Sequence, residues 1–146
     1  MLLYLPSLVE PGMVDGVEVA VSTLGSLKEQ AIAAVDLLQA PPADQRWETA
    51  LPPGTRVLSI FRDGETVVVD LSHEFLAERP LSVSQARQRI YALVNTLTSL
   101  PDVEAVRLLV GEEERTNYFN FYDLTATYRF NRSVIAAGAH SVTASP

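Results

Sequence analysis

The 146-residue sequence contains no cysteine, which excludes disulfide bonds, thiol catalysis and thiolate metal sites. It also lacks any run of about 20 apolar residues, the length that a helix needs to cross a membrane. The opening residues, MLLYLPSLVEPG, show neither the basic start nor the long apolar stretch and cleavage site of a signal peptide. The sequence therefore predicts no membrane-spanning segment, and it displays no leader.

Basic residues are few and scattered. There are 11 Lys and Arg residues against 18 Asp and Glu residues, for a net charge of −7, and no basic cluster is longer than the Arg87/Arg89 pair. Nucleic-acid binding depends on basic side chains that neutralise phosphates, so we expect no nucleic-acid partner. The remaining composition is that of a globular protein, and its length fits one domain. We predict a single domain over residues 1–135 and a flexible tail over 136–146.

The apolar pattern predicts an α+β fold. Short strands are expected at residues 2–5 and 17–21. A helix should begin at the capping box Ser26–Glu29 and end before Pro41. A second helix is expected from about Ser84 to Leu100, after a second capping box at residues 82–85, and a buried strand at 103–110 follows it.

A hairpin lies between the two predicted helices, within RVLSIFRDGETVVVDL. Asp63-Gly64 favours a type I′ turn, because both residues tolerate positive φ. A loop of these two residues would place only apolar residues on one face of the hairpin. One fully apolar face suits a sheet that is covered by helices on one side. We expect that face to be buried beneath the second helix, with Leu58, Ile60, Val67 and Val69 packed against Ile90, Leu93 and Leu97.

The predicted fold is thus an antiparallel β-sheet with two helices packed on one face. Its element order is β(β)-α-ββ-α-β plus a C-terminal strand. That last strand is predicted from the alternation of apolar residues between Tyr122 and Phe130. Such a face either completes the sheet of its own domain or contacts a partner, because large exposed apolar patches are rare on monomers.

The aromatic residues supply the candidate interaction sites. Six of the 11 aromatic residues lie between positions 118 and 130, and the single tryptophan lies in a loop at 41–54 that holds four prolines. The tryptophan either folds back over the core as a lid or serves as a hot spot for a partner. The candidate interaction residues are Trp47, Tyr118, Tyr122, Tyr128 and Phe130.

A polar tract follows the hairpin: Asp70, Ser72, His73 and Glu74. A catalytic interpretation needs a base that is held by a partner and lies near a nucleophile, and a metal site needs ligands that converge from fixed elements. Here all the candidates follow one strand, and the only other histidine lies in the predicted tail. We therefore interpret the tract as a strand end whose side chains bond to the turning backbone. We predict no catalytic residue, no metal and no cofactor.

The ordered segments LLYLP, LPPGTRVLSI, VVVDLSHEF and IYALVNTLTSLPDVEAVRLLVG resemble a GerMN domain, the sporulation and spore germination domain of bacterial envelope lipoproteins. The resemblance covers roughly residues 2 to 111. It implies a small α+β domain, similar in fold to the ring-building motif of secretion and sporulation proteins. Asp70, Leu71 and Ser72 match a structural signature of the family, which agrees with the strand-end interpretation.

The resemblance also implies a function. It implies a non-enzymatic domain for protein interaction or assembly in the bacterial envelope, with a protein partner or a second copy of the chain. The implied location is extracytoplasmic, at the outer face of the cell membrane or in the periplasm. A role in sporulation does not follow, because the domain also occurs in bacteria that make no spores. The alternative is a module that binds a small ligand or cell-wall glycan through Trp47 and the C-terminal aromatic residues.

Overall fold

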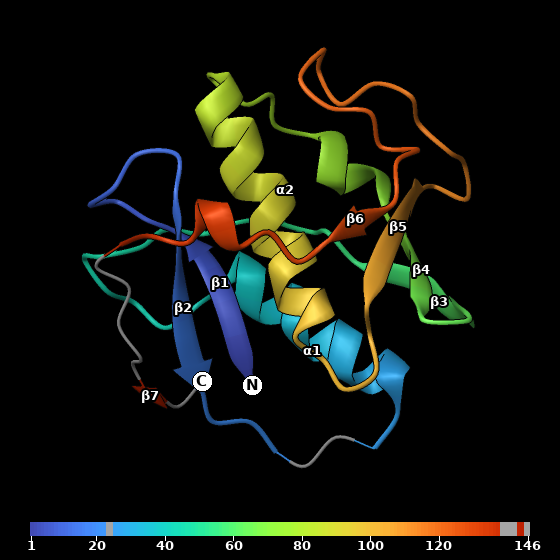
Figure 1. The fold of residues 1–146 in the computed structure, drawn as a ribbon, viewed down its shortest axis with the longest axis horizontal. Coiled ribbons are helices and arrows are strands. Elements are labelled where there is room, and N and C mark those ends of the chain that lie inside the picture. The colour runs from blue at the N-terminus through green and yellow to red at the C-terminus, as the bar shows by residue number, and fades with distance from the viewer. Residues whose placement is uncertain (23–24, 138–142, 145–146) are drawn as a thin grey trace.

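The computed structural model describes residues 1–22, 25–137 and 143–144, and its strands form two sheets (Figure 1). The first sheet has the order β1-β2-β7 and consists of β1 (Leu2–Pro6), β2 (Val14–Val19) and β7 (Thr143–Ala144). The second has the order β3-β4-β5-β6 and consists of β3 (Val57–Asp63), β4 (Thr66–Leu71), β5 (Ala105–Val110) and β6 (Tyr128–Arg129).

Two α-helices lie between these sheets in the view of Figure 1: α1 (Leu27–Gln39) and α2 (Val83–Thr98). Both begin where the sequence predicts. The Ser26 side chain accepts a hydrogen bond from the backbone N–H of Glu29 at 3.0 Å, and Ser82 does the same for Gln85 at 3.1 Å. Two short 3₁₀ helices, η1 (His73–Leu76) and η2 (Arg132–Val134), follow β4 and β6. Among the described residues, no helix is long and apolar enough to span a membrane.

The predicted α+β class, the two helices and the order of the main elements are confirmed. A single antiparallel sheet is wrong, because there are two sheets and β4 and β5 run parallel, with Thr66 opposite Ala105 and Leu71 opposite Val110. The reason is the connection between them. Helix α2 brings the chain back to the end of the sheet where β4 begins. The next strand, β5, therefore starts at that end and runs parallel to β4.

The turn of the β3–β4 hairpin lies one residue further along than predicted. Asp63 pairs with Thr66, so the loop consists of Gly64 and Glu65. Of these two residues only Gly64 has a positive φ, of 64°. A positive φ at the first central position alone is the pattern of a type II′ turn, which favours glycine there.

The shifted turn changes the strand pairing. Ile60 lies opposite Val69 and Arg62 opposite Val67, while a β-bulge between residues 57 and 59 takes Leu58 out of the regular ladder. As predicted, Val67 and Val69 are buried, together with Ile90, Leu93 and Leu97 of α2. The predicted burial of Leu58 is wrong: this side chain is 40% exposed, and Ile60 is only partly buried.

The C-terminal part of the chain forms turns instead of the predicted strand at 122–130. Only β6 remains of that strand, paired antiparallel with the start of β5. The backbone N–H of Tyr118 donates to the Tyr122 carbonyl at 2.8 Å, which closes a tight turn, and the Asp123 carboxylate accepts from the Thr125 N–H at 2.9 Å. Asn and Asp side chains favour such turns, and here they override the apolar alternation.

The predicted tail is partly tied to the domain. The Ala136 N–H donates to the Val14 carbonyl at 2.8 Å, and β7 pairs in parallel with the end of β2. Residues 138–142 and 145–146 of the predicted tail lie outside the described residues. The boundary between a domain at 1–135 and a tail at 136–146 stays a prediction.

Candidate functional site

The polar tract after β4 holds neighbouring segments together. The Asp70 carboxylate accepts a hydrogen bond from the backbone N–H of Glu112 at 3.0 Å, just beyond β5. The Ser72 hydroxyl accepts from the Arg56 N–H at 2.9 Å and donates to the Gly54 carbonyl at 3.3 Å. Both side chains satisfy backbone groups at the end of a strand, which is the arrangement that the strand-end interpretation predicts.

His73 and Glu74 continue the tract into η1, directly after β4. The His73 ring lies against Gly111, where a Cβ atom would collide with its Nε2. The hydrogen bonds of the Ser72 hydroxyl go to the backbone of Arg56 and Gly54, and none joins it to His73. The pKa of Glu74 is lowered, first by its own backbone N–H and then by the Ser72 hydroxyl. Within residues 1–22, 25–137 and 143–144, no three His, Asp or Glu side chains are grouped as metal ligands.

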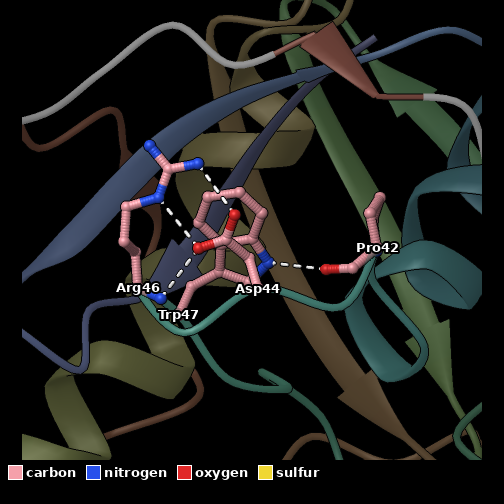
Figure 2. Close-up of polar contacts among 4 residues, drawn as sticks. All are labelled: Pro42, Asp44, Arg46 and Trp47. Atoms are coloured by element: carbon pink, nitrogen blue, oxygen red, sulfur yellow. Dashed lines mark hydrogen bonds and ion pairs between the residues drawn. The ribbon is translucent and has the colours of Figure 1, made fainter.

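Figure 2 shows Trp47 with three residues of its own loop, Pro42, Asp44 and Arg46. The side chain is buried in the core, and its Nε1 donates to the Pro42 carbonyl at 2.9 Å. The Arg46 guanidinium carbon lies 5.0 Å from the centre of the indole ring, while two of its nitrogens each donate to the Asp44 carboxylate at 2.8 Å. This geometry agrees with the lid interpretation and does not leave the ring open to a partner.

Two of the C-terminal aromatic residues also belong to the core. Tyr118 is fully buried and stacks on Phe75, with ring centres 5.5 Å apart. Tyr128 is buried, and its hydroxyl donates to the Asp123 carbonyl at 2.7 Å. Burial raises the pKa of Tyr128 to about 12, and the nearby Tyr91, Asp123 and Tyr122 add to the rise. These rings therefore stabilise the fold from inside.

The other two predicted aromatic residues are more accessible. Tyr122 is half-buried, and its ring meets the Tyr91 ring edge-to-face at 6.5 Å. Phe130 is exposed and lies edge-to-face with Tyr4 at 5.5 Å. Because the other three candidate rings are buried, the five aromatic residues do not form one exposed platform for stacking on a glycan. A binding role for Tyr122 and Phe130 stays a prediction.

An edge strand that the sequence analysis did not select carries the most accessible apolar residues of the four-stranded sheet. Strand β3 pairs with β4 on one side and has no strand on the other among the described residues. Leu58 is 40% exposed and Phe61 is 53% exposed on this strand. The alternation used to predict the hairpin indicated that Leu58 is buried. Because this register was wrong, the sequence did not indicate that β3 is an edge strand with exposed apolar side chains.

A polar pocket of about 230 Å³ also escaped the sequence analysis. It lies between the extended segment 48–52 and the first turns of α2. Gln85, Gln88 and Arg89 line it from the helix, at the i, i+3 and i+4 spacing that places residues on one helical face. That spacing is visible in the sequence, but the opposing segment comes close only in the folded chain.

The fold and these sites describe an α+β domain with an open sheet edge, a polar pocket and no grouped metal ligands among the described residues. The chain belongs to the Germane family, described as sporulation and spore germination, whose model matches residues 3–116. The resemblance to a GerMN domain is thereby confirmed. No curated protein sequence matches the chain.

Solved structures show the same fold at low sequence identity. The first GerMN domain of the sporulation protein GerM from Bacillus subtilis has a TM-score of 0.63 and 16% identity, over 91% of this chain and 98% of that one. The tandem GerMN domains of the same protein have a TM-score of 0.66 and 18% identity, over 95% of this chain and 49% of that one. A candidate lipoprotein from Clostridium perfringens has a TM-score of 0.61 and 14% identity, over 88% of this chain and 85% of that one.

Proposed function

We propose that this GerMN-type domain is a non-enzymatic assembly module of the bacterial envelope and that it binds its protein partner through the free edge of β3. The partner adds an extended segment to the sheet, and a second copy of the chain is the first partner to test. The observation that carries the proposal is the unpaired outer side of β3, together with the exposed side chains of Leu58 and Phe61.

The backbone of β3 is suited to strand addition. In a two-residue hairpin the pair that closes the loop is hydrogen-bonded, and bonded and non-bonded pairs then alternate. Counting from Asp63 opposite Thr66, Phe61 bonds inward to β4, whereas Ile60 and Arg62 direct their N–H and C=O groups outward. These outward groups can form a ladder with a new strand, and Phe61 provides an apolar side chain that a partner can cover.

Features that protect edge strands are also present, and they limit which partners fit. A bulge interrupts β3 near Leu58, and charged residues occupy the hairpin end at Arg62 and Asp63. Bulges and charges are common devices against indiscriminate edge pairing. They restrict strand addition on β3 to a short segment around Ile60 and Phe61. This selectivity is expected of a specific assembly contact.

The location is inferred from the relatives. One similar structure is a sporulation protein and another is a candidate lipoprotein, and lipoproteins are anchored outside the cytoplasm. The tandem GerMN domains show that such domains also occur side by side in one chain. An extracytoplasmic position, at the outer face of the membrane or in the periplasm, agrees with an assembly role.

Sedimentation velocity over a concentration series tests self-association. The test compares the wild type with Phe61→Glu, which places a charge on the β3 edge. Leu81→Glu is the matched control, because Leu81 is 90% exposed in the loop before α2. We expect the wild type and the control to associate as concentration rises and Phe61→Glu to stay monomeric.

A photo-crosslinking amino acid at position 61, with position 81 as the control, tests other partners in cells of the source organism. We expect a specific crosslinked protein at position 61 that is absent at position 81. If the wild type stays monomeric and position 61 captures no protein, the proposed role of β3 is wrong.

A further inference from the structure

The polar pocket beside α2 contains a partly buried arginine, Arg89, whose side chain forms one short hydrogen bond to the backbone. The Arg89 side chain is only 14% exposed. Its Nη1 donates to the Glu78 carbonyl at 2.7 Å, but its Nη2 lies 3.9 Å from the Glu78 carboxylate, which is too long for a hydrogen bond. A guanidinium has several N–H donors, so the remaining ones are available to a ligand in the pocket.

Two glutamines on the same face of α2 add one donor and one acceptor. The Gln88 amide nitrogen donates to the Ser7 and Met13 carbonyls at 3.3 and 3.0 Å. Its amide oxygen accepts no hydrogen bond from the described residues, although the side chain is buried. Gln85 is arranged the other way: its oxygen accepts from the Leu81 N–H at 2.7 Å, so its amide nitrogen is available.

Acidic groups occur in the same pocket. Glu48 lines it from the facing segment and has no hydrogen bond or ion pair with the described residues through its side chain. Glu78 also lines the pocket, and its carboxylate forms only the long ion pair with Arg89. The pocket thus offers donors from Arg89 and Gln85 and acceptors from Glu48, Glu78 and Gln88.

A second buried group next to Arg89 also lacks a partner. The Tyr118 hydroxyl is fully buried, and it has no hydrogen bond in the described part of the chain. Burial raises the pKa of Tyr118, while hydrogen bonding from the Arg89 side chain and then its charge oppose the rise, so the guanidinium lies close enough to donate to this hydroxyl. Arg89 therefore lies next to both the pocket and the Tyr118 hydroxyl, and the Glu78 carboxylate is its ion-pair partner at 3.9 Å.

From this set of unused groups we infer that the pocket binds a zwitterionic ligand of amino-acid size. The ligand carboxylate takes the free donors of Arg89 and Gln85, and its ammonium faces Glu48 and Glu78. The volume of about 230 Å³ gives room for a free amino acid. This ligand site is separate from the β3 edge, so either inference can fail without the other.

A nuclear magnetic resonance titration of the full chain tests the ligand class. The probes are L-serine, which carries both charges, ethanolamine, which lacks the carboxylate, and 3-hydroxypropanoate, which lacks the ammonium. Each is added to about 20 mM, a range that detects millimolar affinity. We expect L-serine to shift the backbone signals of residues 49–51 and 85–89, and each single-charge analogue to bind about tenfold more weakly or not at all.

Variants on α2 test the role of Arg89. Arg89→Gln should weaken L-serine binding by about tenfold or more, because a charge-assisted bond to the carboxylate is lost. Arg87→Gln is the matched control: Arg87 lies on the same helix, donates to the Gly12 carbonyl at 3.1 Å and does not line the pocket. The control should bind like the wild type. Should Arg89→Gln unfold, Gln85→Leu replaces it, with the same expected loss.

Three results would overturn the inference. One is the absence of saturable shifts with L-serine. Another is equal binding of 3-hydroxypropanoate and L-serine, which would make the pocket a simple anion site. The third is unchanged L-serine binding in both Arg89→Gln and Gln85→Leu.

Discussion

Replacing three leucines in turn with alanine tests the register of the β3–β4 hairpin and the position of the core. Leu93 on α2 is fully buried, Leu58 is 40% exposed at the bulge, and Leu81 is 90% exposed before α2. The chemical change is identical at each position, so the difference in stability reports burial. Leu93→Ala should lower the free energy of unfolding by roughly 3 kcal/mol, the sum of lost apolar transfer and an unfilled cavity.

The two other variants show how the loss of unfolding free energy depends on burial. Leu58→Ala should cost about 1 kcal/mol, because part of its side chain is already in water, and Leu81→Ala should cost close to nothing. Urea unfolding followed by circular dichroism gives the three values. A loss of about 3 kcal/mol at Leu93 corresponds to a melting temperature lower by roughly 6–12 °C in a domain of this size. If Leu58→Ala costs as much as Leu93→Ala, Leu58 is a core residue and the bulged register is wrong.

Asn95→Ala removes two hydrogen bonds: the Asn95 side-chain nitrogen donates to the Asn131 carbonyl at 3.1 Å, and the Asn131 N–H donates to the Asn95 side-chain oxygen at 2.9 Å. The change leaves these backbone groups unpaired, so it should lower the free energy of unfolding in urea by roughly 2–4 kcal/mol. The raised pKa of Tyr128 means that the folded state holds the phenol proton more tightly than the unfolded state does. The resulting stability is complete below pH about 10 and is lost as the pH rises towards about 12. The free energy of unfolding should therefore fall less steeply with pH in Tyr128→Phe over this range. Gly111 has a φ of 59° and lies against the His73 ring, so Gly111→Ala should cost roughly 1–3 kcal/mol, and adding His73→Ala should restore the steric part. His73→Ala alone should leave unfolding nearly unchanged, and calorimetry should detect no tight zinc binding before or after that change.

Local signals predicted the two helices well, because the start and end of each helix depend on neighbours in the sequence. The Ser26 and Ser82 caps are formed within four residues, and Pro41 ends α1 by its own chemistry. Val67 and Val69 are buried as predicted, but Val68 and Asp70 on the opposite face are buried too, since β4 is a central strand of the sheet. These parts of the fold needed no knowledge of distant contacts.

The hairpin register was less predictable. Gly64 fits both a type I′ turn after Asp63 and a type II′ turn before Glu65, and the sequence alone does not separate them. A bulge adds one residue to β3, after which an alternating pattern no longer tells the inner face from the outer one. The exposure of Leu58, and with it the apolar character of the edge, therefore depended on a feature with no clear sequence signal.

The candidate ligand pocket could not be predicted for a different reason. Gln85, Gln88 and Arg89 look like the solvated face of an amphipathic helix. Their environment is set by segment 48–52, which is more than 30 positions away in the sequence and approaches α2 because the Leu8 N–H and Pro6 C=O near β1 bond to Arg46 and Glu48. Polar helix positions acquire a binding role only through that tertiary contact.

The residues beyond the family match help to decide which edge of the four-stranded sheet is open. Residues 117–137 lie beyond the matched region of 3–116, and they supply β6, which pairs with β5 at Ala105 and Val106. At the other end of β5, Val110 bridges to Glu113. Both ends of β5 are therefore covered by the chain itself. The Asn95–Asn131 bonds hold the covering segment against α2. Among the described residues this leaves β3, with seven residues, as the longest unpaired edge of the sheet, which makes it the edge best suited to strand addition.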